Sequence, residues 1–294
     1  MALEGLLLID KPVGPTSHDV INQLRRLSGM RRIGHAGTLD PLASGLLLVC
    51  FGRATRLLEY LLNQPKRYEA AVRLGQSTDT FDAQGSVVSE MPVHVTAVDI
   101  EQALEHFRGP IVQYAPAYSA VKRDGIPLYK LARQGLAVER PSREVTIYNL
   151  EMLSWQDPVV HLDIACSSGT YIRALADDLG TILECGGHIS ALRRTAVGTF
   201  MIGQAVSLEE LESGNWSERL LPPDTAVRHL PKIAFSAEAT RRLLLGQRAP
   251  AAGAFEEGTP ACAYEQDGRF LGIVVAAEET WQPRKMFLSG ESGV

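Results

Sequence analysis

The sequence predicts a mixed α and β protein, in which a large domain of helices and strands is followed by a small β-rich module. Its 294 residues, 45% of them hydrophobic, are enough to fill a large core and a small one. Amphipathic helical segments alternate with short apolar strands along most of the chain. Short strands such as "PACAYEQ" and "RFLGIVVAAE" lie within roughly the last seventy residues and predict the β-rich module.

The N-terminal segment predicts a strand followed by a helix. "GLLLID", residues 5–10, is typical of a short buried strand, and the prolines and glycine of "KPVGPTSHD" end it. The next apolar residues recur at helical spacing and share one face: Val20, Ile21, Leu24 and Leu27. Thr16 or Ser17 can cap the start of this helix, and Gly29 can end it.

The elements that follow are predicted from the helical or strand-like spacing of their apolar residues. A helix over residues 95–109 begins with Thr96 and Asp99 at capping-box spacing and closes at Gly109. The other elements, in chain order, are a strand at 45–52, a helix at 54–62, a strand at 66–75, paired strands at 145–153 and 159–168, a turn and helix at 169–180, and a strand at 189–200.

Composition changes at two places along the chain. Residues 118–144 predict an insertion with a short helix from Pro127 to Gly135 and a basic balance, six Lys/Arg against three Asp/Glu. An inserted basic arm of this kind is suited to clamping an anionic partner. Turn-forming residues before Pro222 and Pro223 mark a boundary, so we expect domains at 1–221 and 222–294.

Charge is spread unevenly over a chain whose net charge is −5. Residues 1–75 carry ten Lys/Arg against six Asp/Glu, a balance of +4, and the rest of the chain carries −9. A local basic face on an acidic body suits a polyanion bound in one orientation. A solvated surface of mixed charge explains the same asymmetry, so charge alone does not choose between the two.

Several familiar kinds of site are missing from the sequence. It contains no G-x-x-x-x-G-K-[ST] and no G-x-G-x-x-G loop for a nucleotide or dinucleotide. Its four cysteines are scattered, as is typical of reduced thiols, and "CGGH" at 185–188 has no second ligand pair to complete a zinc site. We therefore expect no metal and no cofactor. "MALEGLLLIDKPVG" predicts neither a signal peptide nor a membrane span, so we expect a cytoplasmic protein.

Carboxylates in three places could take part in chemistry. Asp79 and Asp82 in "GQSTDTFDAQG" could form an acid/base pair, but a turn with Asx hydrogen bonds explains them better. The triplet Ser-His-Asp at 17–19 has the residue types of a triad, yet consecutive side chains diverge and a helix start accounts for them. Asp40, in "RRIGHAGTLDPLASG", lies in a loop before a buried strand, where structural and functional roles are equally open.

Four segments together resemble the TruB-type tRNA pseudouridine synthases. They are "RRIGHAGTLDPLASGLL", "KRYEAAVRLGQSTDTFDAQG", "CSSGTYIRALADDLG" and "LRRTAVGTF", and the resemblance runs in order from about residue 4 to residue 212. The string H-A-G-T-L-D-P-x-A-x-G is the most specific, and K-P-x-G and G-T-Y-I-R accompany it. The C-terminal part resembles the family's PUA-like RNA-binding tail in position, length and β character.

The resemblance implies a fold, an activity and a substrate. The fold is α+β, with a mixed, largely antiparallel sheet flanked by helices, the inserted basic arm and the PUA-like domain. The activity converts uridine-55 in the T-loop of tRNA to pseudouridine, which moves the C1′ bond from N1 to C5 without oxidation or hydrolysis. A stacked uridine must be flipped out of the loop before its ring can be handled. We expect a monomer that acts on the T-arm of tRNA without a membrane, a cofactor or an obligatory protein partner.

The resemblance also assigns roles to single residues. Asp40 matches the catalytic carboxylate, and Arg173 in "GTYIR" matches the cation that keeps it ionised inside an enclosed site. The carboxylate could add to C6 of uracil, attack C1′ or remove a ribose proton. Tyr68 matches an aromatic that stacks on the flipped base and takes part in late proton transfer, and His35 matches the residue that fills the vacated space. The residues that match the pocket lining are Tyr171 and Leu192.

Two other interpretations are open at this point. An RNA-binding protein without turnover could keep the same scaffold, although the presence of Asp40, Tyr68 and Arg173 speaks against that. A catalytic subunit of a guide-RNA-dependent particle could also carry these motifs. The basic insertion favours the stand-alone enzyme, because such an enzyme must grip tRNA unaided. Its candidate phosphate contacts are Lys122, Arg123, Lys130 and Arg133.

Overall fold

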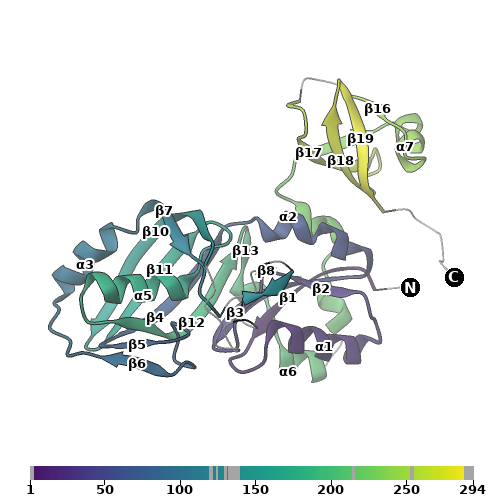
Figure 1. The fold of residues 1–294 in the computed structure, drawn as a ribbon. Coiled ribbons are helices and arrows are strands. Elements are labelled where there is room, and N and C mark those ends of the chain that lie inside the picture. The colour runs from purple at the N-terminus through teal and green to yellow at the C-terminus, as the bar shows by residue number, and fades with distance from the viewer. Residues whose placement is uncertain are drawn as a thin grey trace.

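The chain folds around one large mixed sheet, and a second, smaller sheet lies near the C-terminus (Figure 1). A computed structural model describes residues 3–118, 122–123, 125–128, 131, 140–213, 216–251 and 255–287. The large sheet has ten strands: β1 (Gly5–Lys11), β2 (Ile33–Ala36), β3 (Ala43–Phe51), β4 (Lys66–Leu74), β7 (Gly109–Tyr114), β10 (Ser142–Gln156), β11 (Val159–Cys166), β12 (Gly187–Val197), β13 (Phe200–Met201) and β14 (Val206–Ser207).

Most strand pairs of the large sheet are antiparallel. The order is β14-β1-β3-β12-β4-β11-β10-β7, with β2 beside β3 and β13 beside β12. Only the pairs β1/β14 and β3/β12 are parallel among the described strands of this sheet. The α+β fold with a mixed, largely antiparallel sheet is therefore confirmed.

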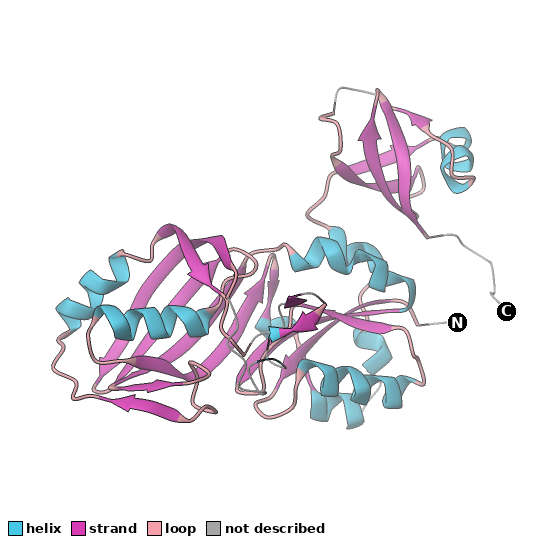
Figure 2. Cartoon of the chain, in the orientation of Figure 1, coloured by secondary structure: helices cyan, strands magenta, loops and turns pink. Residues whose placement is uncertain are grey.

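Strands β1 and β3 are covered on both faces. Leu7 and Val49 point toward helix α1 (Ser17–Ser28), whereas Leu6 and Leu48 point toward helix α2 (Leu58–Leu62) and the 3₁₀ helix Pro223–Val227. A strand that is buried on both faces has a continuous run of apolar residues, whereas a strand buried on one face alternates apolar and polar residues. This explains the runs "GLLLI" and "GLLLVCF". Figure 2 shows helices above and below the strands at the end of the large sheet near the N-terminus.

Helices α3 (Ala97–Glu105) and α5 (Ile172–Ile182) lie over the other half of the sheet, on the same face (Figure 1). Their buried side chains, among them Ile100 and Leu175, share one core with β4, β10 and β11. The helix α6 (Leu208–Ser213) lies near α1 at the opposite end.

Helices α1 and α3 both begin with a capping box; the sequence predicted the box of α3, and for α1 it predicted only that Thr16 or Ser17 would be the cap. Thr16, rather than Ser17, is the N-cap of α1 and pairs with Asp19, while Thr96 pairs with Asp99 at the start of α3. Two helix predictions were wrong in their bounds. Helix α3 ends at Glu105, because Gly109 begins strand β7, and the segment expected as one helix at 54–62 is a 3₁₀ helix (Gly52–Leu57) followed by the short α2.

Two small hairpins lie outside the main sheets. Strands β5 (Gln76–Thr78) and β6 (Val87–Glu90) form one, and β8 (Lys122–Arg123) and β9 (Ile126–Pro127) form the other, inside the predicted insertion. Most of the helix expected from Pro127 to Gly135 lies outside the described residues.

The C-terminal module is a five-stranded sheet in the order β15-β17-β18-β19-β16, so its β-rich character is confirmed. Its elements are β15 (Lys232–Phe235), α7 (Ala237–Leu244), β16 (Ala249–Pro250), β17 (Pro260–Glu265), β18 (Phe270–Ala277) and β19 (Thr280–Met286). Ile273 and Phe287 pack in the same cluster as Leu57 of the first domain. The domain boundary at residues 221 and 222 stays a prediction.

Among the described helices, none has the length and apolar character needed to cross a membrane.

We predict that Gly45→Ala destabilises the protein by about 2–5 kcal/mol, because two costs add. Gly45 has a φ of +103°, and a Cβ there would lie 2.3 Å from the Arg194 carbonyl oxygen on β12. Gly203→Ala is the control, since a Cβ at Gly203 meets no atom within 4 Å. Equilibrium unfolding in urea measures both variants. Equal stability of Gly45→Ala and wild type would contradict the close approach of β3 and β12.

Candidate active site

Strand β12 brings the predicted site residues together by pairing with two strands at once. On one side Leu192 and Arg194 lie opposite Ala43 and Gly45 of β3, and on the other side Arg194 lies opposite Tyr68 of β4. A cavity of about 410 Å³ opens beside this junction. Five of the predicted residues line it: Asp40, Tyr68, Tyr171, Arg173 and Leu192.

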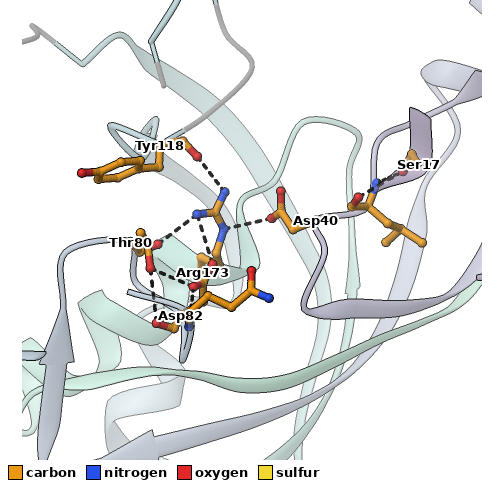
Figure 3. A network of polar contacts seen from close by, with 8 residues as sticks. Ser17, Asp40, Thr80, Asp82, Tyr118 and Arg173 are labelled. Atoms are coloured by element: carbon orange, nitrogen blue, oxygen red, sulfur yellow. Dashed lines mark hydrogen bonds and ion pairs between the residues drawn. The ribbon is translucent and has the colours of Figure 1, made fainter. Parts of the chain in front are cut away.

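Asp40 and Arg173 form an ion pair at the cavity wall (Figure 3). The distance from Arg173 Nε to Asp40 Oδ2 is 3.0 Å. The Asp40 side chain is 42% exposed, whereas that of Arg173 is 9% exposed. The carboxylate therefore faces the space where a ligand can enter, and the guanidinium supports it from the protein side.

The Arg173 guanidinium is also held by three other groups (Figure 3). Nη1 donates to the Thr80 carbonyl oxygen at 2.9 Å and lies 3.4 Å from Asp82 Oδ2. Nη2 donates to the Tyr118 carbonyl oxygen at 3.0 Å. The N–H groups of a guanidinium point in fixed directions within one plane. The contacts of Nη1 and Nη2 therefore determine where Nε points, and so the position at which it contacts the Asp40 carboxylate.

Asp82 is more than the turn residue that its sequence context suggested. Its side chain is buried, and one oxygen accepts hydrogen bonds from the Gln84 N–H at 3.0 Å and the Thr80 hydroxyl at 2.7 Å. The other oxygen faces Arg173. Asp79 in the same loop does behave as a turn residue, since it accepts from the Ser86 N–H at 2.8 Å. Nothing local in the sequence distinguishes the two aspartates, because the partner of Asp82 is remote in the chain.

The start of α5, which carries Arg173, is held by a buried amide. Gln113 of β7 is 1% exposed, accepts a hydrogen bond from the Tyr171 N–H at 2.9 Å and donates to the Tyr171 carbonyl at 3.2 Å. Arg143 lies over the Tyr171 ring, 5.3 Å from its centroid. Arg173 is in the first turn of this helix, so these contacts also set its position.

Two further cations and a phenol complete the wall. Arg194 is buried, and donates to the carbonyl oxygens of Leu46 at 2.7 Å and Gly37 at 3.0 Å. Burial lowers the pKa of Lys66 to about 8, and the neighbouring Arg194 contributes to that shift. Burial raises the pKa of Tyr68, so its hydroxyl is protonated at neutral pH.

The remaining predicted residues lie elsewhere. His35 is on β2, ahead of the Asp40 loop, and it is not among the described residues that line the cavity. Burial and the nearby Arg194 lower the pKa of His35, which favours the neutral imidazole. Lys122 and Arg123 form strand β8. Lys130 and Arg133 lie outside the described residues.

The wall is suited to an anionic or polar ligand with a flat ring. Four cationic side chains and one carboxylate line it, so its charge balance is positive. Tyr68 and Tyr171 offer aromatic surface, and Leu192 offers apolar surface. Within the described part of the chain, no group of three or more His, Cys, Asp or Glu side chains is placed to hold a metal ion.

Comparison with known proteins gives consistent matches. Residues 25–172 match the model of the TruB family pseudouridylate synthase N-terminal domain, and residues 173–230 match that of the tRNA pseudouridylate synthase B C-terminal domain. The chain is 45% identical over 280 residues to tRNA pseudouridine synthase B of Chromohalobacter salexigens, covering 94% of this chain and 91% of the relative. It is 43% identical over 298 residues to the protein of that name from Pseudomonas aeruginosa, covering 98% and 97%.

A solved structure is also similar over almost the whole chain. It is an H/ACA ribonucleoprotein bound to a substrate RNA containing 2′-deoxyuridine. The TM-score is 0.75 at 25% sequence identity, and the match covers 97% of this chain and 85% of that one.

We predict that Asp82→Asn lowers the free energy of unfolding by about 2 kcal/mol or more, because the buried Arg173 would lose one of its two carboxylates. Asp79→Asn is the matched control in the same loop, and should change it by less than about 0.5 kcal/mol. Denaturant unfolding of both variants tests this. Equal effects of the two substitutions would contradict a special role for Asp82.

Proposed function

The chain belongs to the TruB family of pseudouridylate synthases, and from that premise we propose that it modifies uridine-55 in the T-loop of tRNA with Asp40 as the catalytic carboxylate. Conversion of a uridine in tRNA to pseudouridine is the activity of this enzyme, since relatives of that activity match nearly its whole length. The position in tRNA and the residue roles are the proposed part.

The observation that carries the proposal is the Asp40–Arg173 pair. A carboxylate that is 42% exposed to a cavity and lies 3.0 Å from a buried guanidinium has a cationic partner on its protein side, while its outer side stays accessible. Such a group can act as a nucleophile or a base without further activation. Among the acidic residues that the structure describes, only Asp40 lines this cavity.

The reaction rearranges one nucleotide and conserves its atoms. The N1–C1′ bond breaks, the uracil turns, and a C5–C1′ bond forms. The proton on C5 is then lost, and N1 gains one. Asp40 adds to C6, attacks C1′ or removes a ribose proton. Arg173 stabilises the negative charge of the carboxylate.

The tyrosines are suited to hold the flipped base. We propose that the Tyr68 ring stacks on the uracil, and that Tyr171 and Leu192 line the rest of the pocket. The Tyr68 phenol is protonated, so it can accept the proton from C5 only if it gives its own hydroxyl proton to another group. We propose that His35, on the strand before the Asp40 loop, fills the space that the flipped base leaves in the RNA.

Contacts outside the cavity would hold the rest of the tRNA. The basic insertion and the module at 222–294 are proposed as RNA-binding parts, because the first carries six Lys/Arg against three Asp/Glu and the second has the β-rich character expected of a PUA-like domain. We also propose a cytoplasmic monomer that needs no protein partner. Relatives that match nearly the whole chain under the name tRNA pseudouridine synthase B favour this over a guide-RNA-dependent subunit.

We predict that Asp40→Asn reduces product formation to background while tRNA binding survives. The amide keeps the size of the side chain but removes its charge and its nucleophilic or basic oxygen. Affinity should hold or improve, because a negative charge facing a polyanion is unfavourable. Tritium release from C5-labelled tRNA, with filter binding in parallel, measures both quantities. Turnover near the wild-type rate would sink the proposed role of Asp40.

A second prediction concerns salt. Replacing Lys122, Arg123, Lys130 and Arg133 with alanine should weaken tRNA binding and flatten the slope of log K against log salt concentration by about 1–3. Neutralising two acidic residues of the same insertion, Asp124→Asn with Glu139→Gln, is the matched control and should tighten binding. If the alanine variant keeps the wild-type affinity and slope, the insertion is not a phosphate clamp.

A further inference from the structure

The direction of the Asp40 carboxylate depends on how the backbone around it is held. The side chain is 42% exposed, and its ion pair with Arg173 holds it from one side. Asp40 lies in the loop between β2 and β3, and the Ala43 N–H donates to the Asp40 carbonyl at 3.0 Å. The residues on either side of it, Leu39 and Pro41, are both bound by a different segment of the chain, residues 12–17.

Ser17 holds Leu39 by two hydrogen bonds. Its hydroxyl donates to the Leu39 carbonyl oxygen at 3.0 Å and accepts from the Leu39 N–H at 2.8 Å (Figure 3). Ser17 is 1% exposed, so water does not compete for these bonds. The Leu39 carbonyl belongs to the planar peptide that ends at the Asp40 nitrogen, so fixing that oxygen fixes the plane from which Asp40 starts.

The other neighbour is held at the same time. The Gly14 N–H donates to the Pro41 carbonyl at 2.8 Å. The loop that carries Gly14 is shaped by Lys11, whose ammonium donates to the carbonyls of Pro12 and Pro15, both at 2.8 Å. Asp40 therefore sits between two bound residues.

Capping of α1 does not require the Ser17 hydroxyl. Thr16 is the N-cap, and its side chain accepts from the Asp19 N–H at 3.1 Å and donates to the Asp19 carboxylate at 2.6 Å. Ser17 is the first helical residue, and its side chain leaves the helix to reach Leu39. The two adjacent hydroxyls thus have separate tasks, one inside the helix and one across to the Asp40 loop.

We propose that Ser17 is a positioning residue for the isomerisation, which orients the Asp40 carboxylate by binding both polar groups of the Leu39 backbone. This rests on the proposed catalytic role of Asp40. Small errors in the position of a reacting group reduce the rate strongly while leaving binding by distant contacts intact. The effect of losing the Ser17 hydroxyl should therefore appear in the chemical step and not in affinity for tRNA.

The test compares Ser17→Ala with Thr16→Ala in single-turnover experiments at saturating enzyme, with tRNA binding and thermal unfolding measured alongside. Ser17→Ala should lower the single-turnover rate about 10- to 100-fold, with Kd within about twofold of wild type. Thr16→Ala removes the cap of the same helix, so it should lower the unfolding midpoint while its rate stays within about twofold. A purely structural role of Ser17 would make the two variants alike.

A second substitution separates the hydrogen bonds from the space that the side chain fills. Ser17→Cys keeps a side chain of similar shape but has a thiol that is a weak donor and acceptor, so its rate should also fall. It decides the question if Ser17→Ala does not fold. A folded Ser17 variant with the wild-type rate would overturn the proposal, and so would an equal rate loss in Thr16→Ala.

Asp40→Asn, measured in the same series, distinguishes this inference from the function on which it rests. If Asp40→Asn is inactive and the Ser17 variants react at the wild-type rate, only the positioning role is wrong. If Asp40→Asn remains active, the catalytic role of Asp40 is wrong, and the positioning role falls with it.

Discussion

The guanidinium of Arg173 is the group on which the arrangement of the site depends. It meets Asp40 from the loop after β2, Asp82 and the Thr80 carbonyl from the β5–β6 loop, and the Tyr118 carbonyl. A charge that is only 9% exposed is tolerated when such partners surround it. Segments remote in the chain must therefore converge on one point, and the position of the Asp40 carboxylate is one result of that convergence.

The short pairing between β3 and β12 leaves room beside the sheet for this convergence. Strand β12 pairs with β3 over three residue pairs, Leu192–Arg194 against Ala43–Gly45, and runs beside β4 for most of its length. The loop that carries Asp40 joins β3 at the start of the short parallel segment, and it lines the cavity together with Tyr68 of β4 and Leu192 of β12. Gly45 lets the two backbones approach there, and Arg194 binds the carbonyl of Gly37, the first residue of the loop, and that of Leu46 in β3.

Sequence reasoning predicted the parts of the fold that local rules determine. The capping box of Thr96 and Asp99 and the cap of α1 were predicted from spacing, because the partners lie within a few residues. The long apolar strands were predicted as apolar runs because both of their faces are buried. The bounds of α3 and the short strands β2, β5, β6 and β7 were missed, since pairing with distant strands and not periodicity decides them. Asp40 and Arg173 were identified by resemblance to a family and not by any pattern of hydrophobicity. Asp82 and Ser17 looked like a turn and a helix start, because their decisive contacts lie elsewhere in the chain.

The buried cations around the site are bound by neutral carbonyl groups and keep their positive charge, so Asp40 is the one carboxylate among the described residues that line the cavity. Lys11, Lys66 and Arg194 are all buried, and each donates to two backbone carbonyls. Burial lowers the pKa of both lysines to about 8. Carboxylate partners in place of the carbonyls would have cancelled the positive field that suits a phosphate-bearing ligand. The contacts that satisfy each buried charge also fix backbone: Lys11 binds the segment that holds Pro41, and Arg194 binds Gly37 at the start of the Asp40 loop.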